Sequence, residues 1–156
     1  MTIRADYTEK EWHLLVFAPI FAVTYVGLID GKIDRQETLA MNEALKRKEE
    51  AYTSCHLVSA AVDDLPSLTR EMLIPGELRY VETRGEALRI FQKIARLVDK
   101  KASTEEAEIY KQFLVDIVCR VARSSGKLLG LIGDDVCEEE AEFIRMMKVA
   151  IGVVSR

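Results

Sequence analysis

Apolar residues recur along most of this chain at the spacing of an α-helix. Between Glu86 and Val98 they cover well over half of the helix circumference, which predicts a central helix. The segment from Glu106 onward and the final segment each carry one apolar stripe, and we expect both to pack on a common core. The stripes comprise Phe113, Leu114, Ile117, Val118, Val121 and Ala122 in the first of these segments, and Phe143, Ile144, Met147, Ala150, Ile151 and Val154 in the second.

Helix starts are marked by pairs in which a Ser, Thr or Asp precedes a Glu by three residues. In this capping box the first side chain caps a free backbone N–H, and the Glu reaches back to another. Four pairs follow the pattern: Thr8/Glu11, Asp34/Glu37, Thr83/Glu86 and Ser103/Glu106. Together with the apolar stripes they predict an all-α fold, a single compact helical bundle that spans residues 1–156 as one domain.

Pro19 lies inside the first predicted helix. It has no N–H to donate to the carbonyl of Leu15, and its ring opposes that carbonyl. We therefore expect a kink or a split of this helix at residues 15–19.

The other two prolines fall in a stretch without a sustained period, from Asp63 to Arg84. Such a stretch is typical of an irregular connector between helices. Its last part, residues 76–83, has a strand-like alternation but no partner strand, so we expect a loop or a short helix there.

A short acidic element occurs twice in the chain. Residues 27–37 (GLIDGKIDRQE) align without a gap with residues 130–140 (GLIGDDVCEEE), 103 residues downstream. Gly-Leu-Ile opens both copies, a glutamate closes both, and apolar positions at helical spacing follow each. Each copy therefore predicts a helix, an acidic turn and a second helix. The two pseudo-repeated elements extend over about residues 8–60 and 104–156.

Two explanations of these acidic residues stay open. Carboxylates favour a helix N-terminus, where free N–H groups and the helix dipole supply partial positive charge, and this alone explains Asp34 and Glu37 as a capping pair. In the second copy Cys137, a poor cap, stands in the capping position, and the capping pair lies two residues earlier. Glu140 is then left without a capping role, which indicates metal ligation.

If the two copies pack about a pseudo-two-fold axis, their carboxylates approach one another. Carboxylates within a few ångströms raise one another's pKa unless they bind a cation. Ligands that are all oxygen favour calcium, magnesium and manganese over zinc. An ordinary EF-hand is excluded, because Val26 and Leu28 stand at the first and third positions of its loop and have no side-chain oxygen. The candidate ligands are Asp30, Asp34, Glu37, Asp134, Asp135 and Glu140.

The chain resembles the TerB family of tellurite-resistance proteins in three features. These are a long apolar helix that runs into L-I-D-G-K-I-D-x-x-E, an all-helical body, and a second acidic turn before the last helix. The resemblance implies an all-α fold with internal pseudo-symmetry, divalent-metal binding by acidic residues at the turns, and a role in stress response. It also implies partners among other tellurite-resistance and stress-response proteins, a membrane partner included. By position, the implied ligands are the six candidates named above. The second copy departs from the family pattern, because it reads I-G-D-D-V-C-x-x-E.

The charge balance excludes several other classes of protein. The 156 residues are 49% hydrophobic and 31% charged, with a net charge of −4. This balance fits a soluble globular protein and leaves no positive excess for nucleic acid or an anionic membrane surface. The longest apolar run, Leu14 to Ile29, is shorter than the roughly 20 residues that cross a bilayer. Since no basic start precedes that run, we expect a cytoplasmic protein without direct membrane insertion.

We expect no enzymatic activity. His13 and His56 are the only histidines, and neither lies in a catalytic or di-iron motif. The three cysteines are widely spaced, with no pair that suggests zinc or redox chemistry. Two alternatives to a metal-binding module remain. One is a helical protein–protein interaction scaffold without metal, and the minor one is a magnesium-dependent phosphoesterase.

Overall fold

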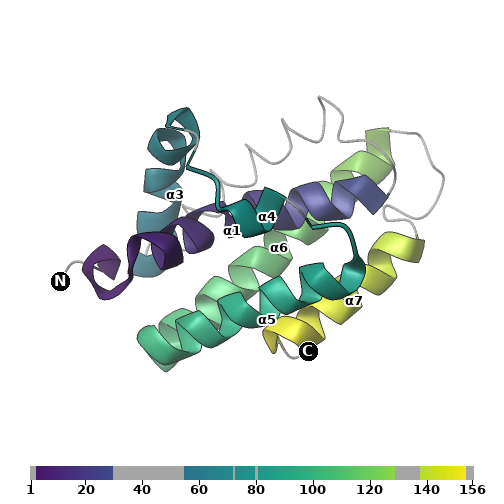
Figure 1. Ribbon diagram of the computed structural model, residues 1–156. Helices are drawn as coiled ribbons and strands as arrows, with labels where there is room; N and C mark the ends of the chain where they lie inside the picture. The colour runs from purple at the N-terminus through teal and green to yellow at the C-terminus, as the bar shows by residue number, and fades with distance from the viewer. Residues whose placement is uncertain (1–2, 30–54, 72, 80, 129–137, 154–156) are drawn as a thin grey trace.

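The computed structural model of this chain is an all-α bundle (Figure 1). It describes residues 3–29, 55–71, 73–79, 81–128 and 138–153. Within these ranges the chain forms no strand, and the predictions of an all-α fold and a compact bundle are confirmed. The elements are a 3-10 helix η1 (Ile3–Asp6) and the α-helices α1 (Glu9–Ile29), α3 (His56–Arg70), α4 (Gly76–Arg79), α5 (Arg84–Lys101), α6 (Thr104–Leu128) and α7 (Glu138–Ile151).

Helices α1 and α6 form the centre of the bundle, where they lie side by side and run in the same direction (Figure 1). Helix α5 runs in the opposite direction, because only Ala102 and Ser103 separate it from α6. Helix α7 packs chiefly against α5, and α3 packs against α1 and α6. This topology brings the C-terminal ends of α1 and α6 and the N-terminal end of α7 to one end of the bundle (Figure 1).

The predicted apolar stripes form the core. In α5, six residues of the stripe are buried, while Leu88 and Leu97 at its edges are partly buried. The buried residues are Ala87, Ile90, Phe91, Ile94, Ala95 and Val98 in α5, Phe113, Leu114, Ile117 and Val118 in α6, and Phe143, Ile144, Met147 and Ile151 in α7. The side chains of Val121, Ala122 and Val154 lie outside the described residues. The three predicted helices are confirmed.

Helix α1 continues through Pro19, so the chain is not split there. The carbonyl of Leu15, which has no helical donor at position 19, accepts a hydrogen bond from the hydroxyl of Tyr110 in α6 at 2.6 Å. Both side chains are fully buried. A side chain from another helix thus satisfies the carbonyl that the proline leaves free. No helix in the described part of the chain is both long and apolar enough to cross a membrane.

The capping pairs lie where the sequence predicts helix starts. Thr8 and Glu11 exchange both hydrogen bonds of a capping box: the N–H of Glu11 donates to Oγ1 of Thr8 at 3.2 Å, and the N–H of Thr8 donates to Oε1 of Glu11 at 2.9 Å. The side-chain oxygens of Thr83 and Ser103 cap α5 and α6 in the same way, each accepting the N–H three residues later. The fourth predicted pair, Asp34/Glu37, lies outside the described residues.

The predicted irregular connector is wrong in its first part. Helix α3 extends through Pro66 to Arg70. Its buried residues recur at helical spacing, and Pro66 lies on the exposed side, so packing of the apolar face outweighs the donor that the proline removes. The prediction of a loop or short helix further along is confirmed by α4. The buried residues of α3 are Leu57, Val58, Ala61, Leu65 and Leu68.

Candidate functional site

The described helices next to the two acidic elements meet at one end of the bundle. Helix α1 ends at Ile29, directly before Asp30, while α6 and α7 flank residues 129–137 on either side. Figure 1 shows the last turns of α1 and α6 beside the first turn of α7. The fold therefore anchors the two sequence copies at neighbouring points.

An aromatic cluster holds these helix ends together. Tyr25 in the last turns of α1 packs on Phe143 of α7, with 4.9 Å between ring centroids. Phe91 of α5 lies 6.2 Å from Phe143 and 5.4 Å from Phe21 of α1. Pairs of rings at such separations attract one another beyond the apolar area they bury. The cluster ties α1, α5 and α7 together near the point where α1 ends and α7 begins.

The ring contact brings the flank before the first element close to the flank after the second. Tyr25 precedes Asp30 by five residues, and Phe143 follows Glu140 by three. At 1.5 Å of rise per helical residue, offsets of five and three residues correspond to about 7.5 Å and about 4.5 Å. The N-terminal flank of the first copy and the C-terminal flank of the second are thus close in space.

Helix dipoles of both signs meet at this end of the bundle, because α1 and α6 end there and α7 begins there. The C-terminal end of a helix carries partial negative charge, and α1 has no basic residue in its last turn to offset it. Burial raises the pKa of the Tyr25 phenol, an effect that the nearby Arg84 cation opposes and Glu86 reinforces. The phenol therefore stays neutral at neutral pH and adds no charge of its own.

The side chains of all six predicted ligands lie outside the described part of the chain. Asp30, Asp34, Glu37, Asp134 and Asp135 lie outside the described residues. Glu140 lies in the first turn of α7, and its side chain is outside what the structure describes. Over the rest of the chain that is described, no three His, Cys, Asp or Glu side chains are placed to hold a metal ion.

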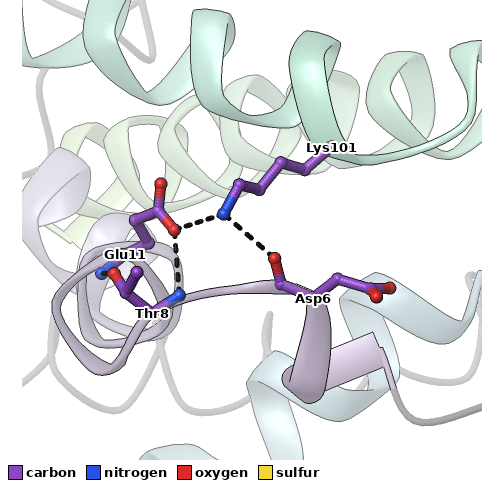
Figure 2. Close-up of polar contacts among 4 residues, drawn as sticks. All are labelled: Asp6, Thr8, Glu11 and Lys101. Atoms are coloured by element: carbon purple, nitrogen blue, oxygen red, sulfur yellow. Dashed lines mark hydrogen bonds and ion pairs between the residues drawn. The ribbon is translucent and has the colours of Figure 1, made fainter.

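A second polar cluster lies at the opposite end of α1, and sequence reasoning missed it. Nζ of Lys101 donates to Oε1 of Glu11 at 2.6 Å and to the backbone carbonyl of Asp6 at 3.0 Å (Figure 2). The same ammonium lies 5.6 Å from the ring centroid of Tyr7. The hydrogen bond from Lys101, followed by that from Thr8, lowers the pKa of Glu11. This cluster joins the end of α5 to the start of α1, and its paired charges give it a structural role.

Asp64 makes a third polar link between distant segments. Its Oδ2 accepts a hydrogen bond from Nε1 of the buried Trp12 at 2.7 Å and lies 3.4 Å from Nη1 of Arg4. The carboxylate thereby satisfies the indole N–H of the largest buried side chain and ties α3 to η1 and α1. Asp64 therefore has a structural role, because it accepts the hydrogen bond of the buried indole N–H.

Cys55 and His56 are adjacent in the sequence but differ in burial. Cys55 is buried, and burial raises the pKa of its thiol, whereas the adjacent His56 is exposed at the first position of α3. The two side chains therefore differ in exposure to solvent. Cys119 is partly buried within α6. A thiol with a raised pKa is a poor nucleophile at neutral pH.

No protein-family model, no curated protein and no solved structure matches this chain.

Proposed function

We propose that this protein is a TerB-like, non-enzymatic module that binds a hard divalent cation through carboxylates at helix N-termini. The contact between Tyr25 and Phe143 is the observation that supports this proposal most directly, because it holds the flanks of the two acidic copies close together. The copies are far apart in sequence, so such closeness is required for a shared site. The proposed ligands are Asp30, Asp34, Glu37, Asp134, Asp135 and Glu140.

The chemistry of the proposed ligands sets the class of ion. Carboxylates that converge repel one another, and a divalent cation offsets that repulsion at neutral pH. Because the ligands are all oxygen, calcium, magnesium or manganese fits better than zinc. The uncompensated C-terminal end of α1 adds partial negative charge on the same side.

The cellular role is proposed from the resemblance to the TerB family. We place the protein in the cytoplasm, in tellurite resistance or stress response, beside other proteins of that response and a membrane partner. The ion would act as a structural element that orders the acidic segments for such partners. Catalysis has no support from the buried thiol of Cys55 or the exposed ring of His56.

Thermal unfolding with and without cations tests the proposal. A ligand at a hundred times its dissociation constant stabilises the folded state by about 2.7 kcal/mol. For a domain of this size, the melting temperature should then rise by about 5 to 10 °C. We expect such a rise with calcium, magnesium or manganese, and its loss in the double variant Glu37→Gln/Glu140→Gln.

A matched control separates the site from general charge effects. Glu105 and Glu108 are exposed on α6 near its N-terminal end, at the other end of the bundle from the acidic elements. The variant Glu105→Gln/Glu108→Gln removes the same charge and should keep the full cation response. Absence of any shift in the unmutated protein would leave the interaction scaffold as the better function. Phosphoester turnover with magnesium that Glu37→Gln/Glu140→Gln abolishes would establish the phosphoesterase instead.

A further inference from the structure

Helix α5 is strongly basic although the chain as a whole is acidic. It carries six basic and two acidic residues, a net charge of +4, in a chain whose net charge is −4. The remainder of the chain therefore carries −8. Such a concentration of positive charge on one helix creates a local field that differs in sign from that of the whole molecule.

Four of these cations form a stripe along the outer face of α5, which we name the basic stripe: Arg89, Lys93, Arg96 and Lys100. Their spacing of four, three and four residues places them on one side of the helix, opposite its buried side, and all four are exposed. At 1.5 Å per residue the stripe is about 16 Å long. Figure 1 shows α5 on the outside of the bundle.

Acidic groups near the basic stripe are engaged elsewhere or neutralise only part of it. Oδ1 of Asp99 accepts a hydrogen bond at 2.6 Å from the buried Lys111 of α6, which directs this carboxylate away from the stripe. Lys93 pairs with Glu77 of α4 at 2.9 Å. The other three cations of the stripe have no carboxylate partner among the described residues. Because their charge is uncompensated, they are free to bind an external anion.

We propose that the basic stripe binds an acidic helical segment of a partner protein. A helix whose carboxylates follow the same spacing of four, three and four residues has the same rise between charges, so it can lie along α5 with each carboxylate opposite a cation. The small cross-section of such a helix matters as well. At physiological ionic strength charges act over about 8 Å, so a ligand confined to the stripe is screened from most of the remaining negative charge.

The same charge distribution disfavours larger anionic partners. A membrane surface or a nucleic acid duplex extends beyond the stripe and meets the rest of the molecule, which carries −8. Its approach is then opposed by repulsion at the edges of the contact. The stripe alone also holds fewer phosphate-binding cations than the six to ten contacts, approximately, that are typical of strong duplex binding.

The test uses two labelled synthetic peptides of identical composition. In one, glutamates follow the spacing of four, three and four residues on an alanine-rich helix, and in the other the order is scrambled. Fluorescence anisotropy with the full chain, in the presence of a chelator, measures affinity independently of any bound metal. We expect the matched peptide to bind more tightly, and the double variant Arg96→Ser/Lys100→Ser to lose about tenfold in affinity.

The control variant is Lys10→Ser/Arg70→Ser, which removes the same charge from exposed positions of α1 and α3. It should bind the matched peptide as the unmutated chain does, and circular dichroism should show both variants fully helical. Equal binding of the two peptides, no binding of either, or equal losses in the two variants would overturn the proposal. The proposal would also be overturned if the chain bound phosphatidylserine vesicles or duplex DNA more tightly than the matched peptide and Arg96→Ser/Lys100→Ser abolished that binding. The stripe would then be a binding site for a membrane or for DNA.

Discussion

Replacing Tyr110 with Phe should destabilise the fold, because it orphans a buried carbonyl. The hydroxyl of Tyr110 donates to the carbonyl of Leu15 at 2.6 Å, and both residues are fully buried. Burial raises the pKa of Tyr110 well above its usual value, so the hydroxyl remains protonated and able to donate. Position 19, which would supply the helical donor, is Pro19.

The expected cost follows from that geometry. Leaving a buried acceptor without a partner costs about 1 to 3 kcal/mol, whereas Phe keeps the same ring and so loses little packing. Each kcal/mol corresponds to about 2 to 4 °C in the melting temperature of a domain of this size. Urea unfolding at equilibrium measures the free energy directly, and an unchanged m-value would show that the unfolding transition is the same.

A double-mutant cycle with Pro19→Ala isolates the cause. The alanine restores an N–H four residues after Leu15, so the carbonyl keeps a partner when Tyr110 is replaced. We expect Tyr110→Phe to cost less in the Pro19→Ala background, with a coupling of about 1 kcal/mol or more. Equal costs in the two backgrounds, or no cost in either, would refute the reasoning.

Three further outcomes are expected from the described contacts. Lys101 lowers the pKa of Glu11, so this ion pair stabilises the fold at pH values above the ordinary carboxyl pKa of 4.5. The stabilisation is lost as pH falls through the lowered pKa. In urea unfolding, Lys101→Met should therefore cost more stability at about pH 7 than at about pH 3. The free energy of unfolding of Lys111→Met should stay within about 1 kcal/mol of that of the unmutated protein, because Met keeps the apolar stem and Asp99, which is more than half exposed, becomes hydrated. Lys111→Ala, which removes the stem, should have a lower melting temperature. Terbium bound at the proposed cation site should luminesce when tyrosine is excited, and Tyr25→Phe should weaken that luminescence without changing terbium affinity; an unchanged signal would separate the ion from the aromatic cluster.

The candidate site divides into a part that sequence could predict and a part that it could not. The repeated acidic element and its flanking helices were visible from residue types and spacing, because capping and periodicity are local properties. The role of Tyr25 and Phe143 was not visible, since nothing in either segment indicates its partner in the other. The signal that could have indicated this contact is the aromatic residue shortly before the first acidic element, Tyr25, and the one shortly after the second, Phe143.

The error at Pro66 has a physical cause of the same kind. Local preference disfavours a proline within a helix, so the stretch from Asp63 onward was predicted to be irregular. This stretch is helical as far as Arg70 because the buried face of α3 packs on α1 and α6, which are far away in sequence. Only a packed structure contains that contribution.

By itself the sequence determined that α1, α5, α6 and α7 are helices, where α1, α5 and α6 begin, and which faces of α5, α6 and α7 are buried. These properties arise from interactions within about four residues, which any helix of this composition makes. Tertiary structure alone decided which distant groups meet: Tyr110 with the carbonyl of Leu15, and Lys101 with Glu11, pairs separated by 95 and 90 residues. The reason is that an apolar stripe identifies a face but not its neighbour, and the neighbour is selected only when all the helices pack at once.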